Sequence, residues 1–325
     1  MRTLRLLAVA ALAMLALAVV AGPMLAQAPA APAPPTVVRV DIAGEWAVTT
    51  NEDQPHRAPG AELGDYTGLP INDAARQKAD HWDASILSQP ERQAQAHPVQ
   101  YHMRGPGPNL RIIKLLNPVT QVHFAYTMAG HFGRADRLIY VDGRNHPSDY
   151  SEHTWDGFST GEWDADGHFN VVTTHMKYGV INRNGVPASP LAVLREQFSR
   201  HGLYMVSLFL VDDPIYVEEP LARSQTWTWA PEQNLEIGAA FEPVDELGDR
   251  PLGWVPHWPL GTRPTEYGMM HNLPFAATRG GRESTYPEYM DKIKQLAAED
   301  AVQKAADAAK AAAAEAAAAA SARRR

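Results

Sequence analysis

The chain has 325 residues, a formal net charge of -8 and no cysteine. The acidic balance, with no basic stripe ahead of the three C-terminal arginines, argues against a nucleic-acid partner. The absence of cysteine excludes disulfides, thiol catalysis and thiolate metal sites. The fold must therefore rest on a hydrophobic core, which a chain of this length can bury.

The N-terminus predicts export. Met1–Arg5 is a short basic head, Leu6–Ala21 is an almost unbroken apolar run, and small residues precede Gln27. These are the three regions of a secretory signal peptide in their usual order. The alternative is an uncleaved membrane anchor, but the apolar run is short for a membrane span. We expect a signal peptide at 1–26, a flexible leader at 27–35, and a periplasmic or secreted protein without stable membrane insertion.

Strands and turns are expected to dominate the region up to residue 230. Apolar residues alternate or run between turn residues in ten segments, namely 37–42, 44–50, 110–116, 119–128, 137–141, 162–163, 168–176, 191–199, 203–212 and 223–229. Asp166-Gly167 and Arg200–Gly202 are typical hairpin turns. Asn72 is a capping residue and predicts a short helix to residue 80. The segments 52–70 and 90–108 are expected to be irregular.

Successive hairpins, with no long helix between strands, argue against a βαβ fold. They predict a mainly β protein: an antiparallel, lipocalin-like barrel or curved sheet with wrapping loops and short helices. Gly44-Glu-Trp46 resembles the start of small barrels in which a tryptophan closes one end. We expect one β-rich domain at 36–290, in which 230–286 wraps over the barrel. Residues 291–325 predict an alanine-rich helical tail, solvated or available to a partner.

Six different short motifs lie along this domain. They are Asp142-Gly-Arg-x-His-Pro147, His153-Thr-Trp-x-Gly-Phe-Ser-x-Gly-x-Trp163, Thr173-Thr-His-x-Lys177, Arg183-Asn-Gly-x-Pro187, Asp213-Pro-x-Tyr216 and Ala276-x-x-Arg279-Gly-Gly281-x-x-x-x-Tyr-Pro-Glu-Tyr289. Together they resemble a family of exported bacterial proteins that is largely uncharacterised. The resemblance covers most of the mature chain. It implies no reaction and no catalytic residue, and it supports treating 36–290 as one unit.

Histidine is the most informative residue type, because nine of the 13 histidines lie between His97 and His201. Histidine titrates near neutral pH, ligates metals and relays protons. We expect a candidate site at a barrel mouth, where loops collect functional groups. The predicted catalytic residues are His146, His175, Asp142, Arg144 and His153. The predicted substrate-binding residues are Trp155, Trp163, Tyr126, His123 and Lys177.

The chemical reason for this choice is the mixture of groups. A carboxylate such as Asp142 can tune a histidine as acid or base, and Arg144 can hold an anionic group. The alternative is a structural loop in which Asp142 accepts backbone N–H groups and Arg144 pairs with a surface acid. The aromatic side chains, equally, can fill the barrel core instead of lining a cavity.

Two sharper signatures are incomplete. Gly157-Phe-Ser-Thr-Gly161 fits the nucleophile elbow of serine hydrolases, but a strand and a turn follow it where the elbow needs a helix. We expect a glycine-flanked bend there. No compact metal motif is present, although separate strands could bring ligands for zinc or iron together. Such a set would be His123, His146, His153 and His175 with Asp142 or Glu196. No metal site and no cofactor are predicted.

Three functions stay open. The first is an exported enzyme that acts on a small aromatic or apolar substrate by histidine/carboxylate acid–base chemistry, as a lyase, hydratase, isomerase or hydrolase. The second is a non-catalytic, lipocalin-like small-molecule binding protein. The third is a structural envelope protein. The expected partner is a small-molecule ligand or substrate, and the sequence predicts no oligomeric state.

Overall fold

The computed structural model describes residues 37–49, 61–83, 97–102, 109–130, 137–182, 184–233, 251 and 265–322. From Val38 onward they belong to one compact unit. The predicted signal peptide, the leader, the turn at 131–136 and most of 234–264 lie outside the described residues. No helix in the described ranges is both long and apolar enough to span a membrane.

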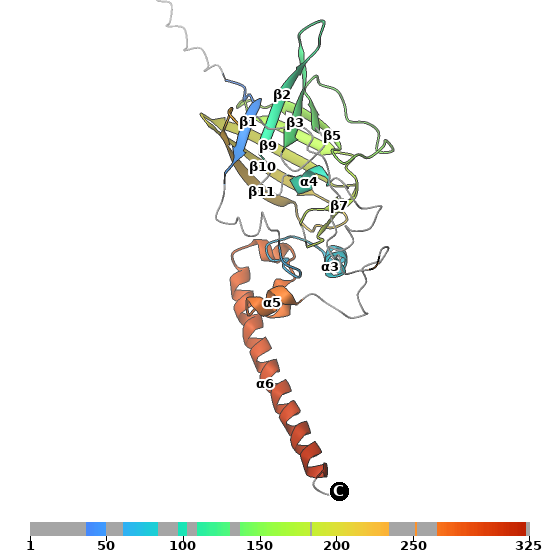
Figure 1. Cartoon of the computed structure of the whole chain (residues 1–325), viewed down its shortest axis with the longest axis vertical. Helices are drawn as coiled ribbons and strands as arrows, with labels where there is room; N and C mark the ends of the chain where they lie inside the picture. Colours follow the sequence, from blue (N-terminus) through green and yellow to red (C-terminus); the bar gives the residue numbers. More distant parts are fainter. Residues whose placement is uncertain are drawn as a thin grey trace, which may run out of the picture. The chain divides into compact units, whose positions relative to one another are not determined.

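Within the described ranges, nine strands close into a barrel (Figure 1). They are β1 Gly44–Val48, β2 Leu110–Leu116, β3 His123–Gly130, β4 Arg137–Tyr140, β5 Phe158–Trp163, β6 Phe169–Thr174, β9 Val193–His201, β10 Tyr204–Asp212 and β11 Leu221–Trp229. Their order is β1-β11-β10-β9-β6-β5-β4-β3-β2, and β2 pairs back with β1. A small separate sheet joins β7 Gly179–Val180 to β8 Pro187–Ala188. The predicted mainly β barrel is confirmed.

One pairing departs from the antiparallel pattern. β4 and β5 are neighbours and run parallel, with Ile139 opposite Ser159 and Tyr140 opposite Thr160. Parallel neighbours cannot be joined by a tight turn. The connection at 141–157 therefore has to return along the barrel before β5 begins, and we call it the crossover loop.

Turn residues explain where the long hairpins fold back. In the β5–β6 turn, Asp164 Oδ1 accepts the backbone N–H groups of Asp166 and His168. Gly167 and Gly202 take φ values of 85° and 62° in the β5–β6 and β9–β10 turns. Glycine adopts this left-handed conformation without steric cost. Both predicted hairpins are confirmed.

Three predicted boundaries were wrong. Residues 38–43 are not a strand, and β3 begins at His123, not at 119. The reason at β3 is a turn in which Asn117 Oδ1 accepts the N–H groups of Val119 and Thr120. The segment expected to be irregular at 90–108 contains a short helix, α4 Val99–His102.

The segment 38–43 closes one end of the barrel. The Val40 carbonyl accepts the indole N–H of Trp163 at 2.7 Å, and the Ile42 carbonyl accepts that of Trp46 at 2.9 Å. The Arg200 guanidinium lies 5.0 Å from the ring centre of Trp46. A Cβ on Gly44 would approach the Trp229 ring to 1.9 Å, so glycine is required there. Two tryptophan side chains are thus tied to the segment at this end of the barrel.

The lumen described here is a packed core. The largest inward side chains are each less than 2 % exposed, among them Trp46, Trp227, Phe169, Phe198 and Phe209. One ion pair is buried with them: the Arg137 guanidinium binds both carboxylate oxygens of Glu196. It also donates to Ser159 Oγ at 3.1 Å and to Thr173 Oγ1 at 2.6 Å.

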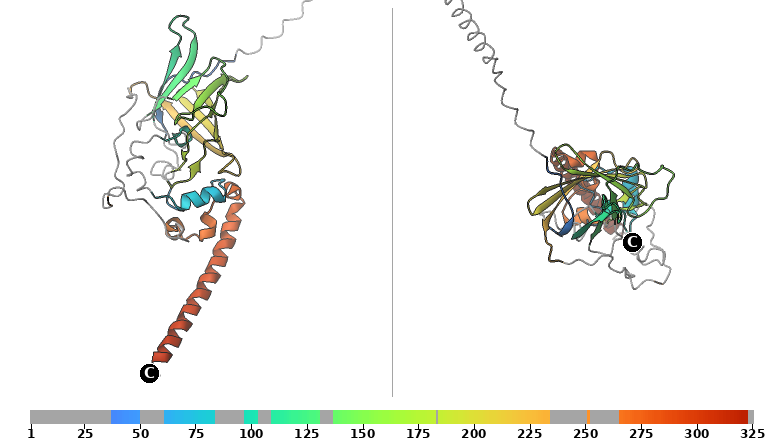
Figure 2. Two further views of the ribbon diagram at one scale, coloured as in Figure 1. Left: turned by 90° about the vertical axis from the view of Figure 1, so that its right-hand side faces the viewer. Right: turned by 90° about the horizontal axis from the view of Figure 1, so that it is seen from above.

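The remaining elements lie outside the barrel strands. They are α3 Asp73–Asp80, α5 Glu266–Met270, the 3-10 turns η2 Phe275–Thr278 and η3 Arg282–Thr285, and α6 Tyr289–Ala322. Asn72 caps α3 by accepting the Ala75 N–H, which confirms the predicted helix. The chain around η2 docks on the segment before α3, because Thr278 O accepts the N–H of Tyr66. Past its contacts with η2 and η3, α6 continues as a lone helix (Figure 2).

Replacing Glu196 by Ala should lower the free energy of unfolding by about 3–5 kcal/mol, because it leaves the Arg137 charge buried without a partner. Glu162→Ala, on the exposed outer face of β5, is the control and should change it by less than about 0.5 kcal/mol. Urea denaturation measures both. Equal stabilities of the two variants would contradict the assignment of the pair to the barrel interior.

Deleting residues 301–325 should shift the melting temperature by less than about 5 °C. Every side chain from 301 to 320 is exposed, so the described part of this tail buries little apolar area. Differential scanning calorimetry is the measurement. A larger fall would show that the tail docks on the rest of the protein.

Candidate functional site

The crossover loop brings three predicted histidines together on the outer wall of the barrel. His146 and His153 come from the loop, and His175 follows β6 directly. Thr160 and Thr174, which contact His146, alternate along their strands with the buried inward side chains of Ser159 and Thr173. The cluster therefore lies on the outer face, not at a barrel mouth as predicted.

A chain of hydrogen bonds joins two of these rings. His175 Nε2 lies 2.9 Å from the Ser148 carbonyl oxygen, and its Nδ1 lies 2.7 Å from Thr174 Oγ1. Thr174 Oγ1 also lies 2.8 Å from His146 Nδ1. His146 Nε2 lies 2.8 Å from Thr160 Oγ1. Every nitrogen of both rings is thus engaged by protein.

The partners decide which nitrogens carry hydrogen. A carbonyl only accepts, so His175 Nε2 is protonated, and in the neutral ring Nδ1 accepts from the Thr174 hydroxyl. That hydroxyl has a single hydrogen, so His146 Nδ1 must donate to it. His146 Nε2 then accepts from Thr160. With both rings neutral, each of the four hydrogen bonds then has one donor and one acceptor.

His153 differs from the other two. Its Nδ1 lies 2.9 Å from the Met176 carbonyl oxygen, so this nitrogen carries the hydrogen. Its ring centre lies 5.1 Å from that of His175. In the described part of the chain, His153 Nε2 has no hydrogen-bond partner. The neutral ring therefore presents a free lone pair.

A short backbone bridge sets the position of these side chains. Thr154 donates to the His175 carbonyl and accepts from the N–H of Lys177, both at 2.9 Å. Beside the bridge, the Lys177 ammonium lies 5.4 Å from the ring centre of Trp155. A Cβ on Gly157 would come within 2.5 Å of the Thr174 carbonyl, so only glycine lets the loop approach β6 this closely. An aromatic face and a cation thus adjoin the histidines.

His175 itself has a φ of 58°, which is uncommon for a residue other than glycine. It is 7 % exposed. Burial, and then the proximity of His175, hold the pKa of His146 below its ordinary value. Both effects favour the neutral form of the His146 ring.

The predicted carboxylate partner is directed elsewhere. Asp142 binds Arg144 in a two-pronged ion pair, with Nη2 to Oδ2 at 2.6 Å, in an exposed part of the loop. The hydrogen bond from Arg144 holds the pKa of Asp142 below its usual value. The Arg144 guanidinium also lies 3.6 Å from the ring centre of Tyr140. This arrangement matches the structural-loop alternative for these two residues.

Three predicted substrate-binding residues lie at the closed end, apart from the histidine cluster. Trp163 donates to the Val40 carbonyl, and the Tyr126 hydroxyl donates to Asp41 at 3.3 Å. His123 packs edge-on against Tyr126, with ring centres 4.5 Å apart. Burial raises the pKa of Tyr126 and lowers that of His123. These side chains help to hold the end closed.

The structure also locates the serine of the Gly-x-Ser-x-Gly pattern and the possible metal ligands. Ser159 lies inside β5 and faces Arg137 and Thr173, so it does not stand on an elbow. Among the described residues, the group of three possible metal ligands that lie close together is Asp164, Asp166 and His168. The hydrogen bonds of Asp164 show that this group builds the β5–β6 turn. The metal-ligand set considered from separate strands is not brought together as a whole, because His123 lies at the closed end and Glu196 in the lumen.

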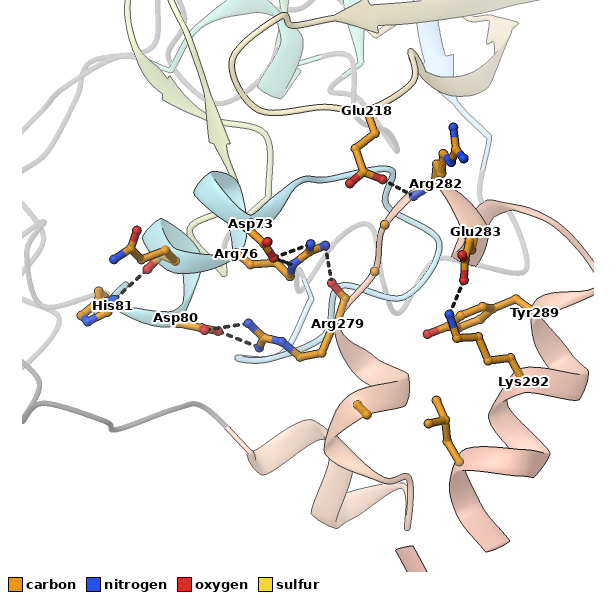
Figure 3. A pocket seen from close by; sticks show the side chains of 15 residues that line it. Asp73, Arg76, Asp80, His81, Glu218, Arg279, Arg282, Glu283, Tyr289 and Lys292 are labelled. Atoms are coloured by element: carbon orange, nitrogen blue, oxygen red, sulfur yellow. Dashed lines mark hydrogen bonds and ion pairs between the residues drawn. The ribbon is translucent and has the colours of Figure 1, made fainter. Parts of the chain in front are cut away.

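A charged groove of about 1200 Å³ lies between α3, the η2–η3 segment and the start of α6 (Figure 3). Three of its cations are held by acids: Arg76 pairs with Asp73, Arg279 pairs with Asp80 at 2.7 Å, and Lys292 pairs with Glu283. Arg279 belongs to the last of the six sequence motifs. We interpret the groove as the joint that fastens this segment to α3.

Comparison with known proteins adds no assignment: no family model, curated protein or solved structure matches the chain. The resemblance to an exported family stays a prediction.

Sequence reasoning missed the groups that organise the cluster. Thr160 and Thr174 bond to the histidines, and the carbonyls of Ser148 and Met176 orient them. Alternation along β5 and β6 could have placed the threonines on the outer face. No local pattern could have identified the carbonyls.

Thr174→Val should lower the free energy of unfolding by about 1–3 kcal/mol, because it removes the hydroxyl shared by two rings. Thr127→Val is the matched control. The Thr127 hydroxyl is buried without a partner, so its loss should be neutral or slightly stabilising. Guanidinium denaturation compares the two variants. A Thr174→Val protein as stable as wild type would show that the hydrogen-bond chain is not formed in solution.

Proposed function

We propose that the protein is an exported enzyme that carries out acid–base chemistry on a small aromatic substrate, with His153 as the general base. The observation that carries the proposal is the free Nε2 lone pair of His153, on a ring oriented by the Met176 carbonyl. A neutral imidazole held in one tautomer is a competent base near neutral pH. The carboxylate of the original hypothesis is not needed for this role.

The neighbouring side chains indicate the substrate class. Trp155 offers an aromatic face, and Lys177 places a positive charge against it. Both adjoin His153 through the bridge between Thr154 and Met176. A flat ring would stack on the indole, and an acidic group on that ring would be attracted to the ammonium. We therefore infer a small aromatic compound with an anionic group.

Non-catalytic binding is the second candidate, and the same Trp155–Lys177 pair favours it. That pair would hold an aromatic anion whether or not His153 removes a proton. Turnover separates the two candidates. In either case the ligand lies on the outer wall, since the lumen in the described ranges is packed.

His153→Ala should reduce kcat/KM by about 10²-fold or more, because a general base contributes a factor of this order. The measurement is turnover of a panel of aromatic carboxylates bearing ester, hydroxyl or unsaturated side chains. Lys177→Ala should raise KM with a smaller effect on kcat. His168→Ala, in the β5–β6 turn, is the control and should match wild type.

Calorimetric titration with the same panel completes the test. Binding without turnover, weakened by Lys177→Ala, would favour the binding protein. Turnover that survives His153→Ala would remove His153 from the mechanism. If the protein neither binds nor turns over any aromatic carboxylate of the panel, both candidates are contradicted.

A further inference from the structure

The hydrogen bonds between His146, Thr174 and His175 join two separate parts of the chain. His146 and Ser148 belong to the crossover loop, and Thr160, Thr174 and His175 belong to the barrel wall. The bonds through these groups therefore fasten the loop to the wall. Two titratable rings lie in the fastening, so its strength depends on their protonation.

One added proton leaves the fastening intact. If His175 takes it, its Nδ1–H donates to Thr174, the Thr174 hydroxyl turns to donate to His146 Nδ1, and His146 Nε2–H donates to Thr160. If His146 takes it, Nε2–H donates to Thr160 and the other bonds keep their direction. Each ring nitrogen has a partner in both cases. The proton can pass between the rings through the Thr174 hydroxyl, which gives one hydrogen as it receives another.

A second proton has a different effect. Both Nδ1–H groups then point at one oxygen, which lies 2.8 Å and 2.7 Å from the two nitrogens. Two positive rings that share one hydroxyl oxygen repel each other, and both rings are partly or fully buried. The Thr174 hydroxyl also has no ring left that can accept its hydrogen.

Among the described residues, no acid contacts either ring to offset this repulsion. From β5 and β6 the rings meet Phe158 and the two threonine hydroxyls, and His153 adjoins His175. The charged residues on the surrounding elements are the Asp142–Arg144 pair, Asp149, Glu152 and Asp156 in the loop, Lys177 on Trp155, Glu162 on β5, and Arg195 paired with Asp212.

We propose that His146, Thr174 and His175 form a two-proton latch on the crossover loop, closed with no proton or one and opened when both rings are protonated. The closed state binds at least one proton fewer than the open state. Opening is therefore favoured as the pH falls. An exported protein meets the acidity of its surroundings directly. Opening would loosen the crossover loop, which carries His153 and Trp155.

Amide hydrogen exchange of the full mature chain tests the latch. Two amides report on the loop: Ser151, which donates to the Ser148 carbonyl, and Thr154, which donates to the His175 carbonyl. Their rates, corrected for intrinsic exchange, should rise about tenfold or more for each pH unit from about pH 6 to pH 5. The amides of β9 and β10 are the internal reference and should keep their protection.

Variants separate the latch from general acid sensitivity. His146→Ala removes one ring, so the loop amides should exchange fast at every pH with no dependence on it, while β9 and β10 stay protected. His168→Ala should behave as wild type. Corrected rates in wild type that do not change with pH would overturn the latch. A His146→Ala protein that keeps the pH dependence would also overturn it. So would loss of protection in β9 and β10 together with the loop.

The latch does not depend on His153 acting as a base. A His153→Ala protein without turnover but with the wild-type exchange profile would support both proposals. A flat exchange profile in a protein whose turnover needs His153 would remove the latch alone.

Discussion

The parallel pairing of β4 and β5 is the constraint on which the candidate site depends. Every other neighbouring pair in the barrel is antiparallel. Two parallel neighbours need a long connection, and in this protein that connection carries His146, His153 and Trp155 back over the outer wall. An antiparallel β4–β5 hairpin would have replaced the crossover loop by a short turn. The same segment would then have carried no histidine cluster.

The closed barrel and its packed lumen make this placement precise enough for chemistry. Arg137, which is paired with Glu196, donates to Ser159 and Thr173 on the inside of β5 and β6. The next residues, Thr160 and Thr174, face outward to the histidines. The inner and outer faces of the same two strands thus hold different polar networks. Groups held on rigid strands are better oriented than groups held by loops alone.

Much of the fold could be predicted from local residues. Asp166-Gly167 and Gly202 specified two hairpins. The parallel pair could not be predicted, because it depends on which strands meet in space and not on any turn signal. The density of histidines indicated the right segment of chain. The expected carboxylate, Asp142, pairs with Arg144 two residues away, which is the kind of local pairing that the structural-loop alternative expects.

The central claim is that backbone carbonyls fix the tautomers of the clustered histidines and leave His153 Nε2 free. Nitrogen-15 NMR of the imidazole rings at about pH 7.5 tests it directly, because the shifts of the two ring nitrogens distinguish the tautomers. In the neutral rings, the structure predicts hydrogen on Nδ1 of His153 and on Nε2 of His175. A neutral His153 ring with hydrogen on Nε2 would contradict this assignment.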